Sequence, residues 1–104
     1  MKPDFQAHFN DRKQWVDVYL EANCEDWGSF LATWKDKNFG VFGELRIYKP
    51  EIRLDTVVHE IIHIISEYAS ANEFPIEKDE EGYANMADEI FREIETELKR
   101  LGLI

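Results

Sequence analysis

Two histidines and a glutamate in one apolar segment have the residue types and spacing of a metal site. His59 and His63 lie four residues apart in TVVHEIIHIISEYAS, and Glu60 directly follows the first of them. Histidines spaced i and i+4 on a helix can direct ring nitrogens to one point about 2.0–2.1 Å away, as zinc requires. Glu60 would project beside that point, where it could take a proton from a metal-activated water and pass it to a leaving amine. The pattern His-Glu-x-x-His therefore predicts zinc-dependent hydrolysis with Glu60 as the catalytic residue.

This chemistry requires the segment to be a helix, although its many β-branched residues would also suit a strand. Its polar side chains share one side of a helical wheel, whereas in a strand they would scatter over both faces; they are Thr56, His59, Glu60, His63, Ser66, Glu67 and Ser70. The periodicity predicts a helix that starts at Thr56, is capped by Asp55 and is buried on its other sides. The alternative is a pair of structural histidines beside solvated glutamates.

A catalytic zinc site usually has three protein ligands and one position left open for water. No histidine follows His63, so a carboxylate is the natural third ligand, and the candidates are Glu67, Glu80 and Glu81. A structural zinc site is an alternative. In that case Glu67 and Cys24 would complete the coordination shell and leave no position for substrate.

The motif and the order of elements from residue 44 onward resemble the gluzincins, which are zinc metallopeptidases with a third-ligand glutamate on the helix after the motif. The likeness extends to the small soluble minigluzincins and to the catalytic cores of membrane metallopeptidases that trim prenylated proteins. Their glutamate helix commonly reads Glu-x-x-Ala-Asp, and residues 81–85 here read EGYAN. The resemblance implies that His59, His63 and Glu81 are ligands and that Glu60 is the general base.

Asn85 is a departure from this family pattern. It occupies the place of an aspartate that orients a ligand histidine, and a neutral amide cannot raise the basicity of the ligand as a carboxylate does. Weaker activity is therefore expected. The helical wheel places Glu80 nearer the apolar stripe than Glu81, which keeps Glu80 as an alternative third ligand.

The remaining patterns predict a single α+β domain, residues 1–104, of zincin-like type. An N-terminal helix is expected over residues 10–24, followed by a small antiparallel sheet of two to three strands. Residues 44–49 are the expected exposed edge of this sheet. The buried active-site helix and a C-terminal glutamate helix, residues 80–102, complete the fold.

Composition narrows the class of protein. The chain has 104 residues, 44% of them hydrophobic, which suits one small domain with one core. Its single cysteine excludes an internal disulfide, and its start lacks an apolar signal core, so a cytoplasmic protein without a membrane span is expected. The net charge of −10 repels phosphate backbones, which argues against nucleic acid as a partner.

The expected function is that of a zinc metallopeptidase acting on a peptide or protein substrate, or of a latent form blocked by residues 99–104. In the resembling family, a peptide adds to the edge of the sheet. Possible donors to the oxyanion are Tyr48, Tyr68 and Tyr83. The alternative is a non-enzymatic interaction module with a structural metal, in which Glu93, Glu95 and Glu97 bind a basic partner.

Overall fold

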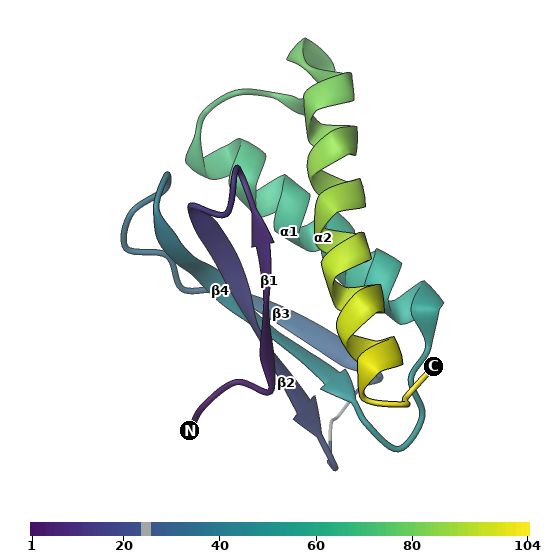
Figure 1. Ribbon diagram of the computed structural model, residues 1–104. Coiled ribbons are helices and arrows are strands. Elements are labelled where there is room, and N and C mark those ends of the chain that lie inside the picture. Colours follow the sequence, from purple (N-terminus) through teal and green to yellow (C-terminus); the bar gives the residue numbers. More distant parts are fainter. Residues whose placement is uncertain (24–25) are drawn as a thin grey trace.

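The computed structural model describes residues 1–23 and 26–104. Its elements, in chain order, are β1 (Phe5–Phe9), β2 (Gln14–Glu21), β3 (Gly28–Ala32), β4 (Gly40–Tyr48), α1 (Leu54–Ala71), the short 3-10 helix η1 (Ile76–Lys78) and α2 (Glu80–Arg100). The strands form one sheet in the order β1-β2-β4-β3, with both long helices on the same side of it (Figure 1). The fold is α+β, but the expected antiparallel sheet of two to three strands is wrong, because the sheet has four strands and is mixed.

The N-terminal helix expected over residues 10–24 is also wrong. Asn10, Asp11 and Arg12 have φ angles of 55°, 54° and 64°, which form a left-handed turn from β1 into β2. After this turn, buried and half-buried residues alternate along the first part of β2, as a strand with one covered face requires. Tyr19 fits a helical face with Val16 and Leu20 in the sequence, but in the strand it lies on the opposite face from Val16, where the Arg46 guanidinium covers its ring at 4.8 Å from the centroid. The last part of the expected helix, at Cys24, lies outside the described residues.

Strand β4 lies in the interior of the sheet. It pairs with β2 in parallel and with β3 antiparallel, so the expectation that residues 44–49 form an exposed edge is wrong. Strand β4 follows β3 in the sequence but lies between β2 and β3 in the sheet. It runs antiparallel to β3 and parallel to β2. Within the described chain, the edges of the sheet are therefore β1 and β3.

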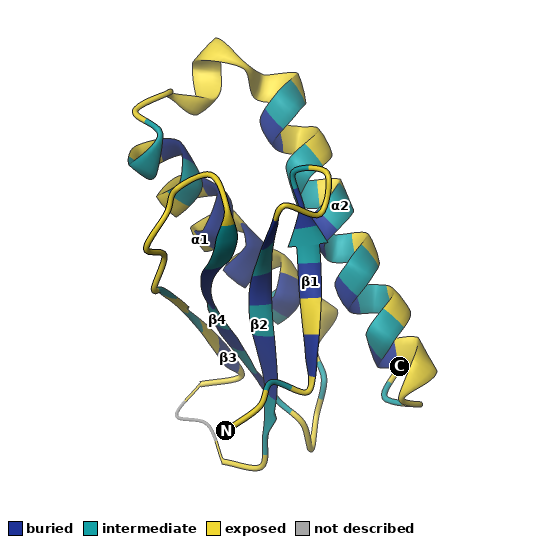
Figure 2. Cartoon of the chain, turned by 60° about the vertical axis from the view of Figure 1, so that its left-hand side comes forward, coloured by how far each residue is buried: buried dark blue, intermediate teal, exposed yellow. Residues whose placement is uncertain are grey.

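One hydrophobic core lies between the sheet and the two helices. Dark blue buried segments of the strands face those of α1 and α2 in Figure 2. The helices contribute apolar residues at spacings of three, four and seven or eight, chiefly Val57, Ile61, Ile64, Ile65, Ile90, Ile94 and Leu98. Each such side chain contributes about 1.5–3 kcal/mol through burial. No helix in the described chain is long and apolar enough to cross a membrane.

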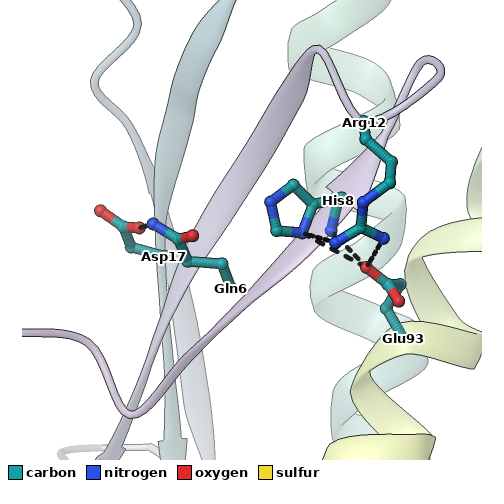
Figure 3. A network of polar contacts seen from close by, with 5 residues as sticks. All are labelled: Gln6, His8, Arg12, Asp17 and Glu93. Carbon is teal, nitrogen blue, oxygen red and sulfur yellow. Dashed lines mark hydrogen bonds and ion pairs between the residues drawn. The ribbon is translucent and has the colours of Figure 1, made fainter.

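A polar network fastens α2 to the outer strand β1 and its turn. Glu93 Oε1 accepts hydrogen bonds from the His8 backbone N–H at 3.0 Å and from Arg12 Nη1 at 3.2 Å. Figure 3 shows these groups converging on the single carboxylate, with the His8 ring at the side. The His8 Nδ1 atom lies 3.4 Å from the same oxygen. The left-handed turn is what brings Arg12 back toward α2.

Candidate metal centre

Helix α1 begins earlier than its pattern suggested. It starts at Leu54, and the N-cap residue Arg53 makes no capping hydrogen bond through its side chain. The expected Asp55 cap is therefore wrong. Asp55 lies in the first turn, where its charge suits the helix dipole, and it pairs with Arg53 at 3.2 Å.

Three stripes run along α1. One faces the core and is buried. The second is the polar stripe, in which His59 and His63 are exposed to solvent. The third is apolar yet exposed, since Val58 and Ile62 are 46% and 60% accessible. The helix is thus buried on one side only, which corrects the expectation that it is buried everywhere except at the polar stripe.

The two histidines point their ring nitrogens at each other. The Nε2 atoms of His59 and His63 lie 3.2 Å apart, and the rings meet edge to face with centroids 4.9 Å apart. Two nitrogens that each lie about 2.05 Å from a tetrahedral ion would be about 3.4 Å apart. The separation on α1 therefore nearly matches two adjacent corners of a tetrahedral coordination shell.

Glu60 is the acidic member of the group and is only 6% exposed. One ligand atom from each of His59, Glu60 and His63 lies within 4.8 Å of the others, so the group can in principle hold a metal ion. Within the described chain no hydrogen bond engages the Glu60 carboxylate, and no fully buried side-chain oxygen lacks a partner. The carboxylate must therefore reach the cleft that it lines.

This cleft lies between α1 and the edge strand β3. It has two adjoining parts of about 440 and 590 Å³, and both are lined by Asp26, Gly28, His59 and Glu60. The larger part continues along β3 to Ala32 and along α1 to Glu67. The histidine pair thus faces a groove with a strand on its opposite wall.

Gly28 explains how closely the two walls approach. A Cβ atom at this position would lie 2.9 Å from Thr56 Cγ2, 3.0 Å from the Arg46 carbonyl oxygen and 3.6 Å from Glu60 Cγ. Real Cβ contacts are essentially never as short as the first of these. Only glycine lets β3 pass this close to the start of the motif, so Gly28 helps to set the place of Glu60.

The structure does not bring Glu81 together with the histidines. Glu80, Glu81 and Asn85 are exposed on the first turns of α2, and none of them lines the cleft. Glu67 does line it, one turn beyond His63. Cys24, the proposed partner of Glu67 in a closed shell, lies outside the described residues.

The three tyrosines considered as oxyanion donors lie elsewhere. Tyr48 stacks edge to face on Trp27, with centroids 5.4 Å apart. The Tyr83 hydroxyl donates a hydrogen bond to the Phe74 carbonyl oxygen. Burial raises the pKa of both Tyr68 and Tyr83, with a smaller contribution from the neighbouring Tyr83 and Asp79 respectively. None of the three lines the cleft.

Comparison of the chain with protein-family models, with curated proteins and with solved structures finds no match. The interpretation of the site therefore depends on its own geometry and on the motif.

The sequence patterns missed two residues of the cleft, Asp26 and Gly28. Asp26 precedes β3 and Gly28 begins it. Both line the cleft because β3 is the edge strand beside α1. A glycine at the start of the alternating stretch GSFLA was the available signal, since glycine in a strand often marks a close approach of backbone. Nothing local singled out Asp26.

Proposed function

We propose that this protein is a zinc-dependent metallopeptidase that hydrolyses peptide bonds in the cleft between β3 and α1. The observation that carries the proposal is the 3.2 Å approach of the His59 and His63 Nε2 atoms, beside Glu60, a residue that is 6% exposed and lines the same cleft. Paired imidazoles suit zinc, and a neighbouring carboxylate suits proton transfer.

His59 and His63 would hold the ion through their Nε2 atoms. Zinc, when bound, acts as a Lewis acid that makes water a stronger nucleophile at neutral pH and polarises a carbonyl group. Glu60 would accept a proton from the attacking water and later deliver it to the amine that leaves. The side chain of Glu60 packs in a nearly buried position beside the histidines, and general acid–base catalysis requires such a positioned group.

The third ligand in this proposal is a carboxylate, and the family resemblance assigns it to Glu81. Glu81 lies outside the cleft lining, whereas Glu67 lines it. Replacing each of Glu67, Glu80 and Glu81 separately by glutamine and measuring the zinc dissociation constant identifies the ligand. Loss of the ligand should weaken binding by more than the roughly 10–100-fold typical of a residue that only supports one.

The decisive experiment compares Glu60→Gln with the wild-type protein. The variant should retain one equivalent of zinc and lose peptide hydrolysis by about 10²–10⁴-fold, because proton transfer is removed while the histidines remain. Glu95→Gln, a substitution on α2 away from the cleft, is the matched control. Unchanged hydrolysis in Glu60→Gln would rule out this mechanism, and absence of zinc from the wild-type protein would rule out the metal site.

The alternative of a non-enzymatic module that binds a basic partner through α2 receives less support. Its three proposed carboxylates already have partners within the chain. Glu93 pairs with Arg12 at 3.2 Å, Glu95 with Lys99 at 3.9 Å and Glu97 with Arg100 at 2.6 Å, as ion pairs. A basic partner would have to compete with these contacts.

A further inference from the structure

The charged residues around the cleft are strongly unequal in sign. Among its lining residues that the structure describes, the acids are Asp26, Asp55, Glu60 and Glu67, and Arg53 is the one arginine or lysine. This imbalance is a property of the cleft itself and does not depend on the acidic surface of α2.

Arg53 does not offset the other acids. Its Nη2 atom lies 3.2 Å from Asp55 Oδ2, and its guanidinium lies 5.0 Å from the centroid of the Trp27 ring. Arg53 and Asp55 therefore neutralise each other at one end of the cleft. Asp26, Glu60 and Glu67 remain.

A divalent cation on the histidines would not remove this negative charge. Its two positive charges would be balanced by Glu60 and by the carboxylate that serves as third ligand. With Glu80 or Glu81 in that role, Asp26 and Glu67 still leave two negative charges in the cleft, and with Glu67 in that role Asp26 still leaves one. Such a groove concentrates the field and attracts positively charged groups.

The two remaining carboxylates line the same cleft as the histidine pair. Glu67 lies one helical turn beyond His63, a rise of about 6 Å along α1. Asp26 lines both parts of the cleft, as His59 does. Alternate side chains of an extended peptide are about 6.5 Å apart, which is close to the rise from His63 to Glu67.

We propose that the cleft selects peptides with lysine or arginine close to the bond at the metal, and that Asp26 and Glu67 determine this specificity. The inference rests on the proposed function for its location and adds the class of substrate. Both carboxylates are exposed, so each contact should be of the modest strength seen for exposed ion pairs.

Binding of uncleaved peptides tests this specificity directly. Zinc-loaded Glu60→Gln protein is titrated with two alanine-based peptides that carry either lysine or glutamine at alternate positions, and Trp27 in the cleft wall contributes to the fluorescence signal. The lysine peptide should bind about 3–20-fold more tightly at low salt. About 1 M sodium chloride should abolish this difference, because the screening length falls to about 3 Å.

Variants of the two carboxylates then assign the effect. Adding Asp26→Asn and Glu67→Gln together should bring the lysine-to-glutamine ratio close to one, whereas adding Glu95→Gln should leave it unchanged. Asp26→Lys combined with Glu67→Gln should favour a glutamate peptide instead. Thermal unfolding of each variant verifies that it is folded, which is expected because both positions are exposed.

The inference is overturned if both peptides bind equally, or if the preference survives removal of both carboxylates. This outcome is separate from failure of the proposed function, which would appear as the absence of hydrolysis of either peptide by zinc-loaded wild-type protein. The binding ratio is measured in either case.

Discussion

Gly28 on β3 lies so close to α1 that a methyl group at this position would approach Thr56 Cγ2 to 2.9 Å and Glu60 Cγ to 3.6 Å. The edge strand and the motif helix are therefore in contact just where the proposed base lies. The sequence placed Glu60 on a helix, and the structure adds that β3 lies opposite it across the cleft.

Gly28→Ala should destabilise the protein by about 1–3 kcal/mol, as expected for overpacking of a tight contact. The double variant Gly28→Ala/Thr56→Ser should recover part of this loss because serine lacks the clashing methyl group, although the contact with the Arg46 carbonyl remains. Urea denaturation gives the free energies of unfolding. Equal stability of Gly28→Ala and the wild type would show that the two walls can separate at little cost.

Zinc should stabilise the folded protein through the histidine pair. At a free concentration about 100 times the dissociation constant, a ligand that binds only the folded state adds about 2.7 kcal/mol. Thermal unfolding should therefore shift upward with zinc in the wild type, and the shift should disappear in His59→Ala and His63→Ala. An equal shift in these variants would place the zinc at some other site.

The network around Glu93 predicts unequal effects for its members. Glu93→Ala should cost about 1–2 kcal/mol, because the His8 backbone N–H loses the acceptor that holds it at 3.0 Å. Arg12→Ala should cost at most about 0.5 kcal/mol, since the Arg12 side chain is 66% exposed and its ion pair is screened by solvent. Chemical denaturation of both variants measures the difference. A larger loss for Arg12→Ala would assign the docking of α2 to the ion pair.

Buried Tyr83 should make the protein sensitive to alkaline pH. Burial raises the pKa of its phenol in the folded state, so the stabilisation by the protonated form is complete below the unfolded value of about 10 and falls as pH rises above it. Tyr83→Phe should lose about 1 kcal/mol near neutral pH, because its hydrogen bond to the Phe74 carbonyl is removed. The variant should also show a shallower loss of stability above pH 10. An unchanged alkaline slope would exclude Tyr83 as its source.

Local patterns identified the helices better than the sheet. Both α1 and α2 carry apolar residues at helical spacing over many turns, and this period is a property of neighbouring residues along the chain. The same reasoning predicted a helix where strand β2 lies, because Val16, Tyr19 and Leu20 also fit one face of a helix. Arg46 on the neighbouring strand β4 covers Tyr19, and because the two residues are far apart in the sequence, the local pattern does not show this contact.

The sequence by itself determined the motif and its geometry on the helix. Residues four apart on one helix must lie side by side, so His59 and His63 meet wherever α1 is placed. Only the tertiary structure decided what faces them. The pairing of β3 with β4 made β3 the edge strand, brought Asp26 and Gly28 to the cleft and left Glu81 outside its lining. Strand order and helix docking join residues far apart in the chain, and they depend on which apolar faces can be buried together, which no local spacing specifies.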